Sequence, residues 1–368
     1  TRISVNQRES VRISRHLKNQ CRFTSSRQHL LTKDDASYMI TGGTAGFGLE
    51  IAQWLASKGA GQLVLLSRSG VKNDETQQIV DQMQENGTKV HVAKVDISNA
   101  ESVNEAVNYV NENLMPLKGI FHGAMVLDDA FLMEITEERY RKVMLPKVAG
   151  ALHLHDATKS LVLDFFLSFS SISSLIGNVG QANYVAANAF LDSFAHFRRA
   201  QGLTATTINL GVLGEAGVVS RNEDVGKLLE GAGIYSFSNE DALDSIEKIL
   251  RKDSTQVGMF DVDWGQWSKT LLTKEIPSRF TELVSAASQG QTLSPELQTL
   301  VEELSTMTEE ERIVYVEDKV LNAISQVLRI PPDRISKDSS INQLGIDSLM
   351  TVELTRKIKG DIGLEITN

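Results

Sequence analysis

Short apolar runs alternate along the chain with longer segments in which apolar residues recur every three or four positions. A short apolar run bounded by turn residues is typical of a buried parallel strand, and the longer spacing is typical of a helix packed on one side. The runs that we interpret as strands are 37–41, 62–66, 89–95, 118–124, 163–169, 207–212 and 256–260. Strands that alternate with helices predict an α/β fold, a doubly wound parallel sheet with ligands at the carboxyl ends of its strands.

The pattern changes after the last of these strands. A stretch rich in Ser, Thr and Gln follows, which we interpret as a linker with a short helix near 296–304. Thr308 and Glu311 then form a capping box ahead of apolar residues at helical spacing. The expected domains are 37–265 for the sheet, 266–307 for the linker and 308–368 for a small all-α unit.

The residues before the first strand differ from the rest. They are rich in Arg and Ser and poor in acidic residues, which is typical of an organelle transit peptide. The chain opens with Thr1 and not with an initiator Met, so we interpret residues 1–36 as a linker or the tail of a preceding domain.

Composition excludes several classes of function. The formal net charge of −10 argues against nucleic-acid binding, which needs clustered Lys and Arg. Cys21 is the one cysteine, so an internal disulfide and a cysteine-based zinc site are excluded, and a reducing, cytoplasmic location is expected. No apolar run approaches the roughly 20 residues of a membrane span. His153 and His155 point to different faces of a predicted helix, so we expect no metal site there.

A glycine-rich segment joins the first predicted strand to the first predicted helix. Glycine lets the backbone turn tightly and approach a pyrophosphate, which binds free N–H groups at the start of the helix. A glycine triad between a strand and a helix is a stronger signal than a triad alone. The residues expected to hold a nucleotide cofactor here are Gly42, Thr44, Ala45, Gly46, Phe47 and Gly48.

The second predicted strand ends in Ser67, Arg68 and Ser69. A cofactor without a 2′-phosphate favours an acidic residue at this position, whereas a guanidinium between two hydroxyls suits the additional phosphate of NADPH. A surface arginine in a turn is the alternative. The other residues expected beside the cofactor are Asp96, Ile97 and Gly123.

The fifth predicted strand ends in a serine cluster, Ser170 and Ser171, and a glycine-bearing loop leads into the next helix. Tyr184 and Asn188 are one turn apart on one face of that helix. A hydroxyl at the end of a strand, facing a tyrosine and an asparagine, suits general acid catalysis on a carbonyl. A crossover with incidental polar residues is the alternative, and we expect His122 to pack beside the cofactor without acting as an acid or base.

The segment from Thr41 to Gly48, the serine pair at 170–171 and Tyr184 together resemble the short-chain dehydrogenase/reductase superfamily, whose sheet is Rossmann-like. Free-standing members usually place a lysine four residues after the tyrosine, where this chain has Asn188. This difference speaks against a free-standing dehydrogenase of small alcohols.

Ketoreductase domains of modular synthases carry their lysine upstream, in a setting like that of Lys147 within Leu145–Gly150. Residues 37–265 therefore look like the ketoreductase of a type I polyketide or fatty-acid synthase. The residues that carry this resemblance are Lys147, Ser171, Tyr184 and Asn188. It implies NADPH-dependent reduction of a carrier-tethered β-ketoacyl thioester to the β-hydroxyacyl thioester. A domain that binds the cofactor only as a scaffold is the non-enzymatic hypothesis.

The resemblance also implies a role for each catalytic residue. Tyr184 would donate a proton to the developing alkoxide, and Ser171 would hydrogen-bond the carbonyl oxygen. A free phenol has a pKa of about 10, and a nearby ammonium from Lys147 would lower it. Asn188 would hold a water molecule that resupplies the proton.

Three residues bear on stereochemistry. Leu127, Asp128 and Asp129 resemble the signature of ketoreductases that give the 3R hydroxyl. An exposed acidic turn that caps the helix around Phe131 to Arg141 is the alternative.

One departure from the family concerns the residues before the sheet. Modular ketoreductases usually have a structurally similar, non-catalytic half ahead of the nucleotide-binding strand, and only 36 residues precede it here. The resemblance therefore implies that an enoyl reductase interrupts the missing half, or that the chain is cut.

The stretch from Leu344 to Met350 resembles the attachment motif of acyl carrier proteins, in which the serine after Asp347 receives 4′-phosphopantetheine. Ser348 would stand at the start of the next helix, where its phosphodiester meets the positive end of the helix dipole. An ordinary helix cap is the alternative. Only 20 residues follow Ser348, so we expect the carrier to be incomplete.

The expected partners follow from the resemblance. They are the β-ketoacyl chain on the carrier and the other domains of one synthase: ketosynthase, acyltransferase, dehydratase and enoyl reductase. A homodimer is expected only through the full-length synthase. Acyl chain length, branching and the choice between polyketide and fatty acid do not follow from the sequence.

Overall fold

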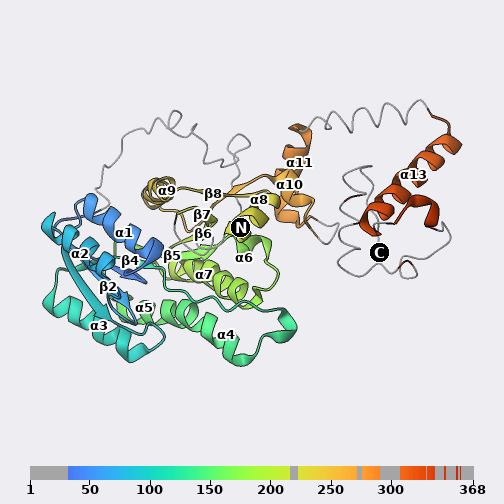
Figure 1. Ribbon diagram of the computed structural model, residues 1–368. Coiled ribbons are helices and arrows are strands. Elements are labelled where there is room, and N and C mark those ends of the chain that lie inside the picture. Colours follow the sequence, from blue (N-terminus) through green and yellow to red (C-terminus); the bar gives the residue numbers. More distant parts are fainter. Residues whose placement is uncertain are drawn as a thin grey trace. The chain divides into compact units, whose positions relative to one another are not determined.

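The computed structural model describes residues 32–215, 223–271, 276–290, 307–328, 330–335, 344, 354 and 357. The chain forms two compact units, which divide between Phe280 and Thr281 (Figure 1). The domain limits expected at 36, 265 and 307 stay predictions. Among the described residues, no helix is both long and apolar enough to cross a membrane.

Seven strands form one sheet in the order β3-β2-β1-β4-β5-β6-β9, and every neighbouring pair is parallel. The strands are β1 (Ser37–Thr41), β2 (Gln62–Ser67), β3 (Lys89–Lys94), β4 (Leu117–His122), β5 (Phe165–Ser171), β6 (Thr206–Leu210) and β9 (Gln256–Met259). The strand order reverses between β1 and β4, which places a ligand crevice at their carboxyl ends. The predicted doubly wound, Rossmann-like sheet is confirmed.

Helices cover both faces of this sheet (Figure 1). One face holds α1 (Gly46–Ser57), α2 (Asp74–Glu85) and α9 (Asn239–Arg251), and the other holds α3 (Ala100–Asn113), α5 (Gly150–Thr158) and α7 (Ala182–Ala200). Successive side chains of a strand point to opposite faces. Tyr38 and Ile40 of β1 therefore join the apolar cluster on one face, while Met39 joins the cluster on the other.

The predicted strand at 207–212 is split in the structure. β6 stays in the main sheet, whereas β7 (Val212–Leu213) pairs with β8 (Ile234–Phe237), which also pairs with β10 (Asp261–Val262). Gly211 separates the two pieces, and a Cβ there would lie 2.6 Å from Cβ of Phe260. The chain thus leaves the main sheet at a glycine that lies against Phe260 before it reaches α8 (Glu223–Gly231).

Three aromatic side chains pack together where the predicted linker begins. Trp264 and Trp267 lie on α10 (Trp264–Ser268), and their ring centroids are 5.1 and 5.3 Å from that of Phe280. All three are buried. The next helix, α11 (Thr281–Gly290), lies within the predicted linker, whereas the helix expected at 296–304 falls outside the described residues.

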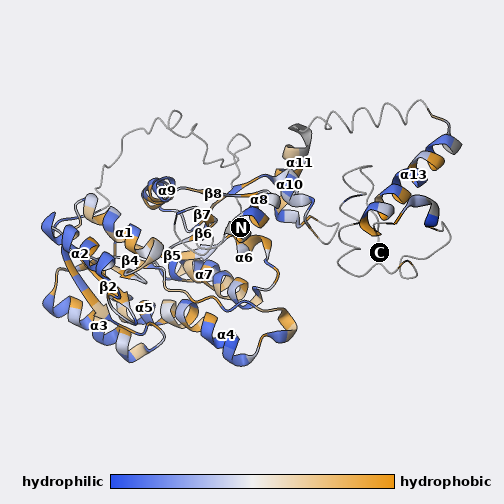
Figure 2. Cartoon of the chain, in the orientation of Figure 1, coloured by the Kyte–Doolittle hydropathy of each residue, from blue (hydrophilic) through white to orange (hydrophobic). Residues whose placement is uncertain are grey.

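The second unit contains α13 (Glu309–Leu328), which begins with the predicted capping box. The backbone N–H of Thr308 donates to Glu311 Oε2 over 2.8 Å, and the N–H of Glu311 donates to Thr308 Oγ1 over 3.3 Å. Apolar and polar residues alternate around α13 (Figure 2), and Ala323 packs in a small cluster with Leu354. The predicted helical character of this unit is confirmed, and Ser348 lies outside the described residues.

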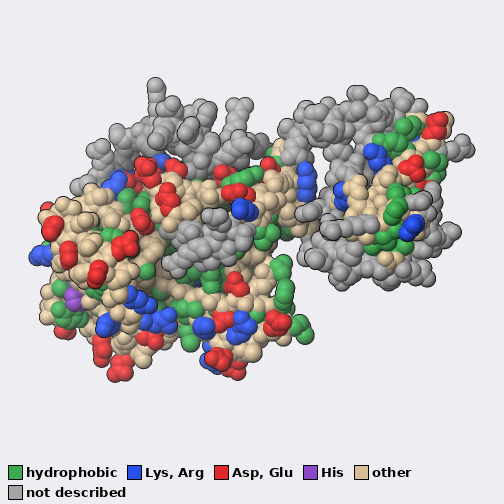
Figure 3. Space-filling view, viewed as in Figure 1, with side chains coloured by type: hydrophobic (Ala, Val, Ile, Leu, Met, Phe, Trp, Pro, Cys, Tyr) green, Lys and Arg blue, Asp and Glu red, His purple; other side chains and the backbone are tan. Residues whose placement is uncertain are grey.

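Figure 3 shows one face of the first unit, and the described residues on that face carry charges of both signs. On the face seen in Figure 3, acidic side chains are interspersed with Lys and Arg. A nucleic-acid surface instead concentrates Lys and Arg on one face or along one helix.

Candidate active site

A cavity of about 1290 Å³ opens at the carboxyl ends of β1, β2, β4 and β5. Of the residues predicted for catalysis, Lys147, Ser171 and Tyr184 line it, whereas Asn188 does not. The residues predicted to hold the cofactor all line it: Gly42, Thr44, Ala45, Gly46, Phe47, Gly48, Ser67, Arg68, Asp96, Ile97 and Gly123. Segments that are far apart in the sequence therefore meet at one crevice.

The glycine loop is shaped for close approach of an anion. Gly42 and Gly46 have φ angles of +74° and +51°, a region that favours glycine. A Cβ on Gly48 would lie 2.3 Å from the carbonyl oxygen of Gly42, so no side chain fits there. Ala45 makes no side-chain cap at the start of α1, and the first N–H groups of a helix have no partner within it. These donors suit a phosphate.

Arg68 lies in the turn after β2. Ser67 Oγ donates to the carbonyl oxygen of Gly70 over 3.2 Å, which closes this turn. Arg68 and Lys72 both line the cavity, and no ion pair joins Arg68 to another described side chain. Its guanidinium is therefore available to an anionic ligand.

Lys147 lies on a single π-helical turn, η3 (Leu145–Ala149), between α4 (Glu137–Met144) and α5. Its Nζ donates to the carbonyl oxygen of Phe169 over 2.7 Å and lies 5.5 Å from the centroid of the Tyr184 ring. Burial lowers the pKa of Lys147 to about 7, and the negative charge of Asp192 opposes this shift. The lysine is thus a buried amine, charged below about pH 7, whose Nζ is held by a neutral acceptor.

Tyr184 lies in the first turn of α7, and its phenol meets Ser171 at the end of β5. Burial raises the pKa of Tyr184, while the polar side chains of Ser171 and Asn188 lower it in part. We expected the ammonium of Lys147 to lower this pKa. The net shift is upward because burial outweighs the polar contacts, and the effect of Lys147 on this pKa stays a prediction.

Asn188 lies one turn after Tyr184, as predicted. The residue is completely buried, and its Nδ2 donates to the backbone carbonyl oxygen of Tyr184 over 2.8 Å. Its Oδ1 is buried without a hydrogen-bond partner among the described residues. A buried acceptor without a partner costs about 1–3 kcal/mol, so this atom favours a polar guest.

His122 is packed beside the site, as expected from the sequence. Its ring does not line the cavity; Nδ1 lies 2.9 Å from Thr41 Oγ1, and Nε2 lies 3.1 Å from the carbonyl oxygen of Lys147. Burial lowers the pKa of His122 to about 4, so the ring is neutral at pH 7. Within the described part of the chain, no group of three side chains is arranged to hold a metal ion.

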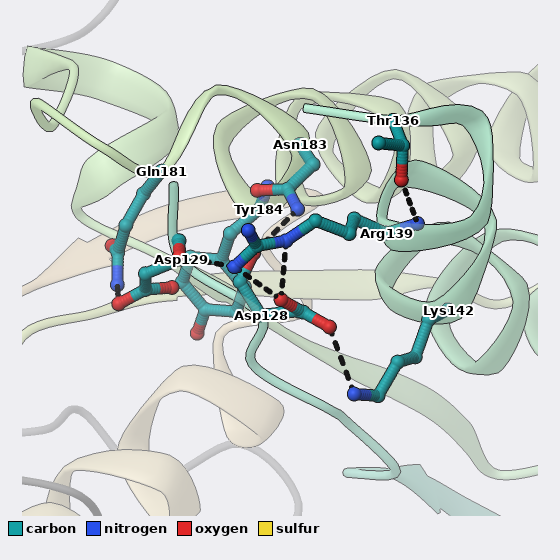
Figure 4. A network of polar contacts seen from close by, with 8 residues as sticks. All are labelled: Asp128, Asp129, Thr136, Arg139, Lys142, Gln181, Asn183 and Tyr184. Atoms are coloured by element: carbon teal, nitrogen blue, oxygen red, sulfur yellow. Dashed lines mark hydrogen bonds and ion pairs between the residues drawn. The ribbon is translucent and has the colours of Figure 1, made fainter. Parts of the chain in front are cut away.

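The stretch Leu127–Asp129 is held by charged partners that the sequence analysis did not predict (Figure 4). Arg139 Nε donates to Asp128 Oδ1 over 2.7 Å, and Lys142 Nζ donates to Oδ2 over 2.8 Å. Hydrogen bonds from Lys142 and Arg139 lower the pKa of Asp128. Two cations three residues apart on a predicted helix, just after an acidic pair, are the sequence signal for this contact.

The same stretch is tied to the start of α7 (Figure 4). Asn183 Nδ2 donates to the backbone oxygen of Asp128, and Gln181 Nε2 donates to Asp129 Oδ2, each over 2.9 Å. Asn183 Oδ1 also accepts from the backbone N–H of Tyr184 over 2.9 Å. The cap of α4 is Thr136, so the acidic pair does not cap that helix. Only Leu127 of the three stereochemical candidates lines the cavity.

A polar network behind the cavity was also missed. Asp192 accepts from Ser174 Oγ over 2.7 Å and from Asn209 Nδ2 over 2.8 Å. Asn209 Nδ2 also lies 3.2 Å from Ser170 Oγ, which donates to the backbone oxygen of Asn188. Asp192 follows Asn188 by four residues, so the 184, 188, 192 spacing on one helix face was the available signal.

Two family models match the chain: a KR domain at residues 36–215 and a phosphopantetheine attachment site at 318–368. A highly reducing polyketide synthase, frbB, of Dothideomycetidae sp. is 33% identical over 87% of this chain and 12% of the relative. The hybrid PKS-NRPS synthetase pynA of Aspergillus niger is 33% identical over 92% of this chain and 9% of the relative. The chain therefore spans a small part of the length of each relative.

Solved structures of ketoreductases are also similar to this chain. A-type ketoreductases from a modular polyketide synthase match with a TM-score of 0.65 and 31% identity, over 72% of this chain and 56% of that one. A ketoreductase domain from the bacillaene assembly line matches with a TM-score of 0.62 and 30% identity, over 67% of this chain and 61% of that one.

Proposed function

Because the chain belongs to the ketoreductase and carrier region of type I polyketide synthases, we propose that it reduces a carrier-tethered β-ketoacyl thioester to the β-hydroxyacyl thioester with NADPH. One observation carries the proposal. Lys147, Ser171 and Tyr184 converge on the cavity that the glycine loop also lines.

NADPH, when bound, supplies a hydride for the β-carbon of the substrate. Ser171 donates a hydrogen bond to the substrate carbonyl oxygen, and Tyr184 transfers its phenolic proton to that oxygen as it becomes a hydroxyl. The raised pKa of Tyr184 keeps the phenol protonated until this transfer. The ammonium of Lys147, 5.5 Å from the ring centroid, stabilises the phenolate that remains.

Asn188 supports the return of the proton. The phenolate of Tyr184 must regain a proton from solvent before the next turnover. The buried Oδ1 of Asn188, without a partner among the described residues, suits a water molecule on this path.

The choice of NADPH over NADH is attributed to Arg68. A guanidinium pairs well with a phosphate, and Ser67 and Ser69 flank it in the turn after β2. The free N–H groups at the start of α1 would hold the pyrophosphate. Asp96 and Ile97, beyond the end of β3, would lie at the adenine.

The proposed product has the 3R configuration. Leu127 lines the cavity, and Asp128 and Asp129 hold it between α4 and α7. A rigid wall of this kind restricts the face of the ketone that meets the hydride.

The carrier role is assigned to Ser348, which would bear 4′-phosphopantetheine and deliver the β-ketoacyl chain. The phosphopantetheine attachment model spans this residue. The ketosynthase, acyltransferase, dehydratase and enoyl reductase of the same cytoplasmic synthase are the proposed partners, and dimerisation is assigned to the full-length synthase.

The reductase is tested with NADPH and a β-ketoacyl N-acetylcysteamine thioester, followed at 340 nm. We expect oxidation of NADPH by the parent chain and a loss of at least about 100-fold in Tyr184→Phe. Tyr140→Phe, on α4 and outside the cavity lining, is the matched control and should keep parental activity. NADPH binding without turnover in the parent chain would instead support the scaffold hypothesis.

The carrier is tested separately by intact mass after treatment with a phosphopantetheinyl transferase and coenzyme A. The mass of the parent chain should rise by one phosphopantetheine arm, and Ser348→Ala should abolish the increase. An arm that persists in Ser348→Ala would remove the assignment.

A further inference from the structure

His122 is buried, neutral and fully bonded, yet its ring stands outside the cavity lining. It comes at the end of β4 and is the register partner of Thr41, the last residue of β1. The ring therefore lies directly behind the nucleotide loop and the turn that carries Lys147. A residue outside the cavity lining acts on the reaction through its neighbours.

The hydrogen bonds around His122 determine its tautomer. The backbone oxygen of Lys147 can only accept, so Nε2 carries the proton and donates to it over 3.1 Å. Thr41 Oγ1 accepts from the backbone N–H groups of Gly123 and Ala124, each over 3.1 Å. Its hydroxyl proton is thus directed at the bare Nδ1, 2.9 Å away. Every polar atom of the pair is used.

Lys147 is consequently held at both ends by neighbouring strands. Its Nζ donates to Phe169 of β5, and its backbone oxygen accepts from His122 of β4. His122 and Ser168, the residue before Phe169, are register partners in the sheet. The orientation of the lysine is therefore set by residues toward the carboxyl ends of β4 and β5.

The π-helical turn makes these two holds important. The N–H of Gly150 donates to the oxygen of Leu145, a five-residue step, and to the oxygen of Lys147, and Pro146 has no N–H to contribute. Lys147 thus lies where the regular α-helical hydrogen-bond ladder is interrupted. The Nε2–H of His122 adds a donor from outside the helix to the backbone oxygen of Lys147, which also accepts from the N–H of Gly150.

Gly150 permits the contact. A Cβ at this position would lie 3.0 Å from Cε1 of His122 and 2.9 Å from Cγ1 of Ile97. Any larger residue would push the imidazole or the turn away. Gly150 is itself outside the cavity lining.

We infer that His122 is a positioning residue for the reduction: its Nε2–H holds the backbone of Lys147 so that the ammonium faces Tyr184. The inference rests on the proposed function. A shift of about 1 Å at a catalytic group can cost about 100-fold in rate, so the loss of this hold should be visible in kcat.

The test compares His122→Gln, whose amide can replace the Nε2 donor, with His122→Leu, which has none. We expect His122→Leu to lower kcat by about 100-fold with the KM for NADPH unchanged, and His122→Gln to restore most of it. His91→Leu, on β3, is the matched control and should retain kcat. Should His122→Leu not fold, Gly150→Ala disturbs the same contact from the other side and should lower kcat.

A readout independent of turnover is the NMR signal of ¹³C-methylated Lys147, identified by its absence in Lys147→Met. In His122→Leu its chemical shift and titration should change, and in His122→Gln they should stay close to the parent. Equal kcat in both variants, or an unchanged Lys147 signal in His122→Leu, would overturn the inference. An inactive parent with a His122-dependent Lys147 signal would refute the reductase and leave the structural hold intact.

Discussion

The ammonium of Lys147 approaches the ring of Tyr184 to 5.5 Å while it donates to the backbone oxygen of Phe169. A buried cation with a single neutral acceptor costs free energy, because desolvation is not repaid by an opposite charge in contact. The chain tolerates this cost at the point where a phenolate is expected to form. Function and stability therefore oppose each other at this residue.

Lys147→Met should separate the effect of this lysine on activity from its effect on stability. We expect reductase activity to fall at least about 100-fold, because the phenolate of Tyr184 loses its stabilising charge. The free energy of unfolding should not decrease, since Met fills similar volume without a buried charge. Activity at 340 nm and urea unfolding at pH 7 measure the two effects. A clear loss of stability would contradict the account of Lys147 as a costly buried cation.

The alkaline side of the pH profile should report Lys147. Its pKa is lowered to about 7, so the charged form declines as the pH rises through that value. We expect kcat/KM to fall above about pH 7, because this quantity reports the free enzyme. Lys147→Arg retains its charge throughout and should flatten this limb, even at a lower rate. An identical limb in Lys147→Arg would assign it to another group.

Arg68→Ala should weaken NADPH selectively. Loss of a charge-assisted hydrogen bond to the 2′-phosphate, worth about 1.5–3 kcal/mol, corresponds to a rise of about 10- to 100-fold in KM for NADPH. NADH lacks that phosphate, so its KM in the same variant should stay near the parental value and serves as the control. A parallel rise for both cofactors would mean that Arg68 supports the fold of the turn.

Acid should destabilise the first unit through His122. Its pKa is about 4 in the folded chain and 6.5 for the unperturbed group, so the unfolded state binds more protons between these values. Stability is complete above about pH 6.5 and is lost as the pH falls toward 4, by up to roughly 3 kcal/mol. Urea unfolding at pH 7 and pH 5 measures this loss. It should be smaller in His122→Gln; an equal loss would place the titrating group elsewhere.

Arg139→Ala should erode stereochemical control. The substitution removes the bonds to Asp128 Oδ1 and to the backbone oxygen of Asp129, each 2.7 Å long, and leaves Lys142 as the remaining cation. We expect a lower excess of the 3R product by chiral chromatography. Arg141→Ala, which removes only the exposed pair with Glu137, is the control. A product ratio unchanged in Arg139→Ala would uncouple the acidic pair from facial selection.

The sheet and nucleotide loop could be predicted because their signals are local. Each strand is a short apolar run, and Gly42 to Gly48 sits between a strand and a helix, so periodicity and glycine geometry are enough. Gly211 shows the limit. Its effect on the strand at 207–212 depends on Phe260, about fifty residues away, which periodicity does not register.

The sequence predicted which residues form the site better than it predicted their pKa values and contacts. Lys147 entered through a family resemblance, since a lysine 37 residues before the tyrosine has no local signal. The direction of the Tyr184 pKa depends on burial, which arises only after packing. The clamp of Arg139 on Asp128 likewise joins segments whose contact the sequence spacing suggests but does not determine.

The contact between Gly48 and the oxygen of Gly42 also constrains how related enzymes can diverge. A Cβ on Gly48 would lie only 2.3 Å from the oxygen of Gly42. The loop therefore admits no side chain at this position, and we expect glycine to be retained there. No comparably close approach restricts the side chain at Arg68 in the turn after β2. A descendant that changed its coenzyme would be expected to do so at the second strand's turn and to keep the loop as it stands.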